Sequence, residues 1–148
     1  RVPSRRAAQR SGLTQALERM FNKIAAWFAK KKKERAEAVM FERAIVVTFD
    51  RDRISATYPD GKIEAVAWKD VQCVAIETND SGPWGADVWW LLEGAHDRCV
   101  YPQGATGEPE VLPELQSRFP GFSDQAVIAA MGCTSNARFV CWESSHAL

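Results

Sequence analysis

Beyond the first forty residues, apolar and polar positions alternate with a period of two, which predicts β-strands with one buried face. The alternation predicts three strands, over residues 43–49, 53–58 and 63–68, that run antiparallel as a meander. A Pro-Asp-Gly sequence at 59–61 predicts the turn between the last two, because proline presets φ and glycine accepts a positive φ. We expect the sheet to continue over residues 71–78.

The run Val-Trp-Trp-Leu-Leu at 88–92 is apolar at every position, which is typical of a strand covered on both faces. We therefore predict a central strand here. The loop before it, residues 79–87, is polar, contains glycine, proline and Trp84, and is longer than the usual hairpin loop of about 2 to 5 residues. Long loops held by a sheet often carry binding residues. This loop is therefore the first candidate site.

The remaining pattern predicts two helices, over 109–119 and 124–131, and two further strands, over 98–101 and 138–142. A proline at the start of the first helix and Ser123 before the second are signals of helix N-termini. Because strands and helices are segregated along the chain, we predict an α+β fold. It consists of an antiparallel sheet of about six or seven strands, C-terminal helices and a basic N-terminal helix.

Residues 20–39 have the period of an amphipathic α-helix: apolar residues recur at i, i+4, i+7 and i+8 from Met20, and four lysines follow. The apolar part is too short to cross a bilayer, which takes about 20 apolar residues. Two interpretations stay open. The helix lies in a membrane interface with its aromatic residues inward, or it packs on the domain or on a second copy of the chain. The candidate residues for this contact are Ile24, Trp27, Phe28, Lys30, Lys31, Lys32 and Lys33.

Residues 1–19 are rich in arginine and precede Met20, which suits a start site. We interpret them as a disordered or non-native lead and leave them out of the fold. A transit peptide is the alternative, because such segments are also rich in arginine and poor in acids. The predicted organisation is a lead over 1–19, a basic helix over 20–39 and a single α+β domain over 40–148.

The charges balance overall, with 19 basic and 19 acidic residues, but they are unevenly divided. Residues 1–35 hold eleven basic and two acidic residues, so the remainder holds eight basic and seventeen acidic ones. This division indicates a basic arm on an acidic domain. Because phosphate would repel the domain, we expect no nucleic acid there. A basic protein partner for the domain, or an anionic membrane surface for the arm, fits the charges better.

The chain has four cysteines, which lie far apart and form no C-x-x-C pair. They are Cys73, Cys99, Cys133 and Cys141. Three of them lie in apolar runs, where free cysteine is commonly a small buried residue. We expect reduced thiols, as in the cytoplasm, and we predict a cytoplasmic protein or one peripheral to the inner membrane. Zinc is not expected, because the ligand spacing is absent and His96 and His146 are the only histidines. We predict no cofactor.

No catalytic motif stands out. The chain lacks the G-x-S-x-G nucleophile sequence and a Gly-rich phosphate loop. The enzymatic alternative is an acid/base site in which Asp80 and Asp87 converge with His96 near Trp84, because close carboxylates can raise one pKa. Acidic loop residues are more often turn formers, so we expect no enzyme. The same four residues, Asp80, Trp84, Asp87 and His96, are the candidate partner-binding residues.

Several short sequences between residues 40 and 143 resemble a known group of proteins. They are AWKDV at 67–71, IETND at 76–80, DVWWLL at 87–92, FPGF at 119–122 and FVCWE at 139–143. In these the chain resembles small uncharacterised bacterial proteins with a pleckstrin-homology-like sheet, some of which are candidate immunity proteins encoded beside toxins. The resemblance implies a pleckstrin-homology-like roll and a non-enzymatic interaction module, such as an immunity-type inhibitor of a basic protein. The chain departs from that pattern in ending on a strand rather than on a long helix.

Overall fold

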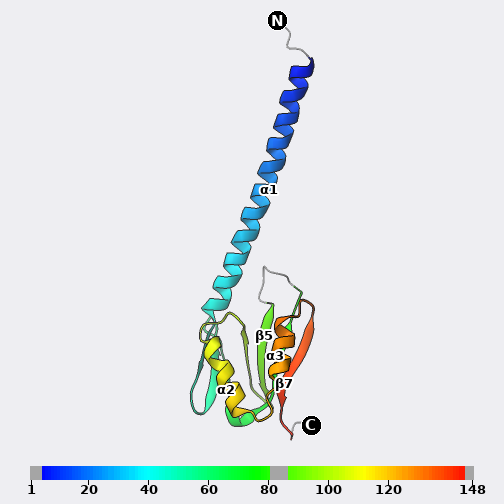
Figure 1. Ribbon diagram of the computed structural model, residues 1–148. Coiled ribbons are helices and arrows are strands. Elements are labelled where there is room, and N and C mark those ends of the chain that lie inside the picture. Colours follow the sequence, from blue (N-terminus) through cyan, green and yellow to red (C-terminus); the bar gives the residue numbers. More distant parts are fainter. Residues whose placement is uncertain (1–4, 81–86, 146–148) are drawn as a thin grey trace. The chain divides into compact units, whose positions relative to one another are not determined.

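A computed structural model describes residues 5–80 and 87–145, with the burial of side chains given from Ser11 onward. The chain divides into two compact units, Arg1–Ala36 and Glu37–Leu148. Helix α1 makes up the first unit and extends into the second, which also holds two antiparallel sheets and two short α-helices (Figure 1). The predicted α+β class, with an N-terminal helix and helices near the C-terminus, is confirmed.

Helix α1 spans Arg5–Ala44 and is longer than the predicted helix at both ends. Its sequence is rich in alanine, arginine, lysine and glutamate, which have high helix propensity, and it contains no proline. Residues 5–19 are therefore helical rather than disordered, while their assignment as a non-native lead stays a prediction. At its other end the helix takes up residues 43 and 44, which the alternation assigns to a strand. The first strand consequently begins at Val46.

The first sheet is the predicted meander of three antiparallel strands, β1 (Val46–Phe49), β2 (Arg53–Thr57) and β3 (Ile63–Ala67). Asp50 closes the first turn, because its Oδ1 accepts a hydrogen bond from the Arg53 N–H at 2.9 Å. Gly61 in the second turn has a φ of 89°, the left-handed conformation that favours glycine. Both turns thus follow from their sequences.

The second sheet has four antiparallel strands in the order β6-β5-β4-β7. They are β4 (Val71–Thr78), β5 (Val88–Gly94), β6 (Arg98–Pro102) and β7 (Ala137–Glu143). Strand β5 is therefore internal, as the apolar run at 88–92 predicts. The strands of the described residues form two sheets rather than the single predicted sheet. The break is the 3-10 turn η1 (Trp68–Asp70), where the buried Trp68 donates its Nε1–H to the Asp50 carbonyl at 2.9 Å.

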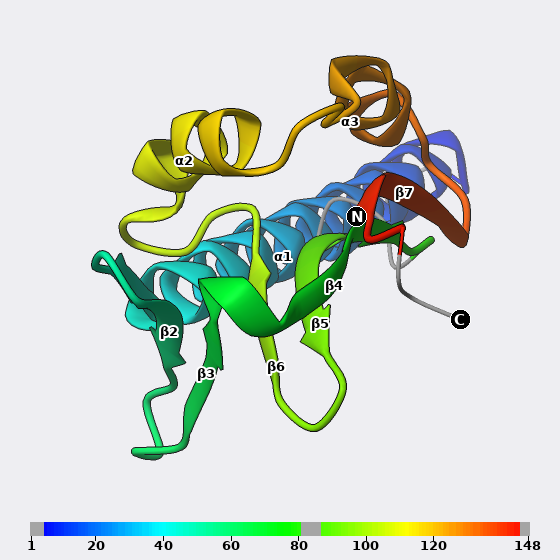
Figure 2. The same cartoon turned by 90° about the horizontal axis from the view of Figure 1, so that it is seen from below.

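The core lies between the two sheets and under helices α2 (Val111–Arg118) and α3 (Asp124–Met131). Both helices lie on the same side of the strands in Figure 2, and α2 follows the 3-10 turn η3 (Glu108–Glu110). Ser123 caps α3 as predicted, its Oγ accepting the Ala126 N–H at 3.1 Å. The largest fully buried side chains come mainly from both sheets and from α2, and include Ile54, Val66, Val74, Ile76, Trp90, Leu92, Tyr101 and Leu115.

Candidate functional site

The predicted loop site is described only at its base. The Asn79 N–H donates to the Asp87 carbonyl at 3.0 Å, and the Asp80 N–H donates to Asn136 Oδ1 at 3.1 Å. Asp80 and Asp87 are both exposed and lie at the same end of the four-stranded sheet. Trp84 lies outside the described residues. The loop base therefore presents two acids to solvent.

Glu42, near the end of α1, adds a third acidic group to this end of the sheet. Burial raises the pKa of its carboxyl, and the charge of Asp87 raises the pKa further. Glu42 also lies tightly against Gly104, because a Cβ at that position would clash with its carboxylate. A positive charge placed near Glu42 and Asp87 would offset their mutual repulsion and favour the ionised carboxylates. The acidic end of the sheet, meaning Glu42, Asp80 and Asp87, is one candidate surface.

His96 does not join these acids. It follows β5 whereas Asp87 precedes it, and a strand of seven residues spans roughly 23 Å. The enzymatic alternative requires His96 to converge with Asp80 and Asp87, and this separation does not allow it, since acid/base partners must reach one substrate. His96 instead lines a surface cavity of about 380 Å³ together with Asp70, Gln72 and other residues at the opposite end of the sheet.

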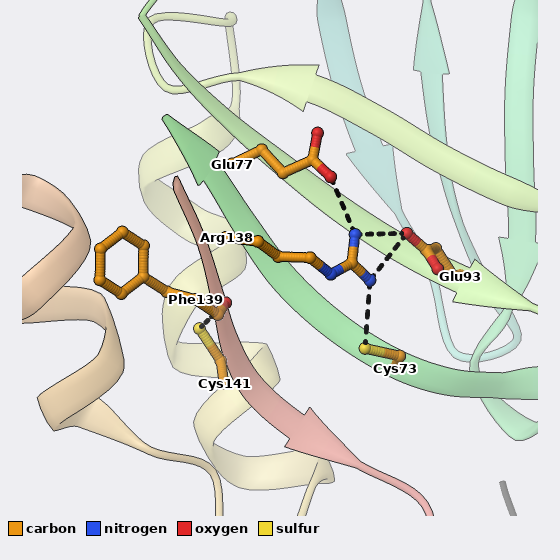
Figure 3. A network of polar contacts seen from close by, with 6 residues as sticks. All are labelled: Cys73, Glu77, Glu93, Arg138, Phe139 and Cys141. Carbon is orange, nitrogen blue, oxygen red and sulfur yellow. Dashed lines mark hydrogen bonds and ion pairs between the residues drawn. The ribbon is translucent and has the colours of Figure 1, made fainter. Parts of the chain in front are cut away.

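A polar network on the outer face of the four-stranded sheet surrounds Arg138 (Figure 3). Its Nη1 donates to Glu77 at 2.9 Å and to Glu93 at 3.1 Å, and its Nη2 donates to Glu93 at 3.1 Å and to Cys73 Sγ at 3.8 Å. Because these residues come from β7, β4 and β5, Arg138 crosses β4 and joins three strands. Ala75, which faces the same side, is completely buried.

The chemistry of this network fits a structural role. Burial raises the pKa of the Cys73 thiol, and this effect outweighs the opposite effect of Arg138. The hydrogen bond to Glu93 is the main cause that raises the pKa of Arg138, so the guanidinium stays charged. A protonated thiol is a poor nucleophile. No local sequence signal predicts this network, because the pairing of β4 with β7 cannot be read from the sequence.

All four cysteines are free thiols, as predicted. Burial raises the pKa of Cys99 to about 12 and that of Cys141 to about 11, which fits inert core residues. Cys133, after α3, differs: hydrogen bonding, chiefly with the Ser135 side chain, lowers its pKa. Among the described residues, no group of three or more histidine, cysteine or acidic side chains is placed to hold a metal ion.

Helix α1 carries most of the exposed large apolar side chains of the described residues. Seven side chains between 43% and 68% exposed form what we call the α1 stripe: Leu13, Leu17, Met20, Phe21, Ile24, Trp27 and Phe28. At about 100° per residue, they fall within a sector of about 120°. The predicted stripe is thus present and extends further toward the N-terminus. The same spacing is present in the sequence upstream of Met20, at Leu13 and Leu17, within the residues interpreted as a lead.

The four candidate lysines, residues 30–33, follow the α1 stripe along the helix. Lys31 lies within the same sector as the stripe, and its side chain points back toward Trp27, with its Nζ 5.9 Å from the Trp27 ring centroid. Lys31 also pairs with Glu34 at 3.4 Å. Trp27 and Phe28 pack edge to face, with ring centroids 5.0 Å apart. The apolar stripe therefore ends in a basic segment, Lys30 to Lys33.

Comparisons with models of protein families, with curated proteins and with solved structures found no match. In the described part of the chain, no helix combines the length and the apolar character that crossing a membrane requires.

Proposed function

We propose that this protein is a non-enzymatic interaction module that attaches to a partner through helix α1. The observation that carries this proposal is the exposure of the seven side chains of the α1 stripe. Full burial of one such side chain is worth about 1.5 to 3 kcal/mol. Contiguous apolar patches of this kind mark interaction sites. A covered stripe would also stabilise α1 itself, because most helix stability in proteins comes from packing of the apolar face.

Two sets of serine substitutions test this proposal. The stripe variant, Phe21→Ser with Ile24→Ser and Trp27→Ser, removes three of the seven apolar side chains. The control, Asn22→Ser with Ala26→Ser and Ala29→Ser, places three serines on the opposite side of the same helix. We expect the native chain and the control to be recovered in a membrane fraction or a larger complex, whereas the stripe variant is recovered as a free monomer.

Sedimentation velocity and fractionation of cells that express each chain supply the measurement. If the native chain and the stripe variant distribute identically and both sediment as monomers, α1 is not an attachment element. Circular dichroism of both variants shows whether the helix is retained. Serine has about the same helix propensity as phenylalanine, isoleucine and tryptophan but a lower propensity than alanine, so substitution should weaken the helix more in the control than in the stripe variant.

The second candidate is an inhibitor of a basic protein, of the immunity type, that uses the acidic end of the sheet. Its support is the excess of acidic residues after residue 35, seventeen against eight basic ones, together with the exposure of Asp80 and Asp87. A pleckstrin-homology-like roll is our proposal for the fold name, supported by the meander followed by further antiparallel strands and C-terminal helices.

This candidate predicts charge-dependent binding at one end of the sheet. We expect Asp80→Asn with Asp87→Asn to weaken binding to a purified basic protein several-fold at about 0.1 M salt, because complementary charges then act over about 10 Å. Asp97→Asn, at the opposite end, is the matched control and should leave binding unchanged. Calorimetric titration provides the affinities. Equal affinities for the native chain, the double variant and the control would show that the acidic end of the sheet does not take part in binding.

A further inference from the structure

We infer that the partner of the α1 stripe is an anionic lipid surface, in which the helix lies parallel to the membrane plane. This inference rests on the proposed function, since it names the partner of the same surface. Three observations favour a lipid surface over a second copy of the chain or another protein: the charge around the stripe, the breadth of the stripe and its length.

The charge around the stripe is strongly positive. Residues 11–36 contain seven basic and two acidic residues, and four of the basic ones form the segment Lys30 to Lys33. Clusters of four to eight basic residues beside an amphipathic helix are attracted to anionic leaflets, with each charge adding to the binding. The acidic excess of the remaining residues would be repelled by the same leaflet, so the basic helix is the part that binds.

A second copy of the chain fits the stripe poorly. Leu13, Leu17, Met20, Ile24 and Trp27 have the alternating spacing of four and three residues that a coiled coil uses. That spacing is interrupted in the next heptad by Lys31 and Glu34. One flank of the seam carries Lys23 and Lys30, and between residues 13 and 30 neither flank offers an acid to pair with them. In an antiparallel pair, where like flanks face each other, Lys23 and Lys30 would bring like charges together, and in a parallel pair the two copies of Lys31 would meet within the seam.

The breadth and composition of the stripe match a membrane interface. A sector of about 120° is wider than the narrow seam of a two-stranded coiled coil. Phe21, Trp27 and Phe28 supply the aromatic residues that favour the boundary between headgroups and acyl chains. Lys31 lies over the Trp27 ring, so its stem can lie along the apolar surface while its amine reaches the headgroups.

The length of the stripe fits a helix that lies on a bilayer. Its sixteen residues, 13 to 28, span about 24 Å, which is shorter than the hydrocarbon core of about 30 Å. The basic segment that follows would stay at the level of the headgroups. Binding of this kind depends on anionic lipid and weakens with salt, whereas a purely apolar contact does not weaken.

Co-sedimentation of the full chain with vesicles tests the inference. One set of vesicles is pure phosphatidylcholine, and the other contains about 30% phosphatidylglycerol; both are used at about 50 mM and about 500 mM salt. We expect the anionic vesicles to bind the chain about tenfold more strongly at low salt, and high salt to remove most of that difference. Equal binding to both vesicles at low salt would overturn the inference.

Two variants and a control separate the contributions of the helix. Replacing Lys30, Lys31, Lys32 and Lys33 by glutamine keeps helix propensity and should remove the preference for anionic vesicles. The stripe variant should lose binding to both kinds of vesicle, whereas the Asn22→Ser, Ala26→Ser and Ala29→Ser control should bind as the native chain does. Strong vesicle binding by the stripe variant would equally overturn the inference.

The same variants distinguish failure of this inference from failure of the proposed function. If vesicles do not bind the chain but the stripe substitutions convert a larger complex into a monomer, the partner is a protein or a second copy. In that case the lipid inference fails and the attachment role of α1 stands. If neither vesicle binding nor the sedimentation coefficient responds to the stripe substitutions, both fail.

Discussion

Glu108 is an acidic side chain in the turn η3 with only 7% of its surface exposed. Burial is the main cause that raises its pKa to about 7, and the neighbouring Glu110 raises it further. Since the ordinary value is 4.5, the folded chain holds this proton more tightly than the unfolded chain does. The contribution of Glu108 to stability therefore declines as the pH rises from about 4.5 to about 7, and it stays low above that.

Glu108→Gln should make the domain less sensitive to pH. The amide resembles the protonated carboxyl in shape and carries no charge to bury. We expect the variant to exceed the native chain in free energy of unfolding by about 1 to 3 kcal/mol at pH 8, and by little at pH 4.5. Urea denaturation at several pH values gives these free energies.

The matched control for this prediction is Glu143→Gln, which removes one negative charge at an exposed position in β7. Its stability should follow the native chain across the same pH range. If the native chain and Glu108→Gln lose stability in parallel between pH 5 and pH 8, Glu108 is ionised in the folded domain without cost, and the assigned effect of burial is wrong.

The sequence predicts the spatial positions of some residues of the candidate surfaces but not of others. Asp80 and Asp87 flank one loop between consecutive strands, so their common location follows from the strand prediction alone. His96 is separated from Asp87 by the whole of β5, and the length of that strand already excludes convergence. Arg138 joins Glu77 and Glu93, which are 61 and 45 residues away, and no local pattern could indicate such contacts.

At the scale of elements, local signals fixed most boundaries. Helix α3 begins after Ser123, whose Oγ accepts a backbone N–H, and strands β2 to β6 lie close to the predicted ranges. The division into two sheets was not predicted, because it depends on η1 and on the burial of Trp68 rather than on periodicity. Helix α1 was predicted too short at both ends, since the residues before Met20 were set aside and the alternation after residue 40 suggested a strand.

The amphipathic character of the α1 stripe is not visible in the average composition of the whole helix. Averaged over 40 residues, α1 is strongly polar, because its lysine, arginine and glutamate residues outweigh the apolar ones. Between Leu13 and Phe28, however, the apolar side chains keep to one side. The amphipathic pattern is therefore visible only when a short stretch of the helix is considered. The exposure of these apolar side chains is typical of a surface that contacts a partner.

At the scale of the whole molecule, charge and packing divide the chain at almost the same place. Basic residues dominate up to residue 35, and the boundary between the compact units falls between Ala36 and Glu37. The residues of the hydrophobic core cluster all lie in the second unit, from Ile45 to Cys141. An attachment helix joined to a separately stable domain would have these properties. Whether the second unit is stable without the first can be tested without knowing the partner.

Removal of residues 1–36 should leave the second unit folded. Because the core cluster begins at Ile45, the fragment 37–148 loses none of its residues, and we expect its melting temperature to lie within about 4 °C of the native value. The fragment 46–148 is the contrasting control. It lacks the fully buried Ile45, and it also lacks the Arg43 carbonyl, which accepts a hydrogen bond from the Thr106 hydroxyl at 2.6 Å.

Loss of a buried isoleucine costs about 2 to 5 kcal/mol, so the shorter fragment should melt far lower or fail to fold. Differential scanning calorimetry of both fragments and the full chain decides between these outcomes. A fragment 37–148 that is unfolded, or as unstable as 46–148, would mean that the first 36 residues contribute to the stability of the domain. The two units would then not be independently stable, and the division into an attachment helix and a separate domain would be wrong.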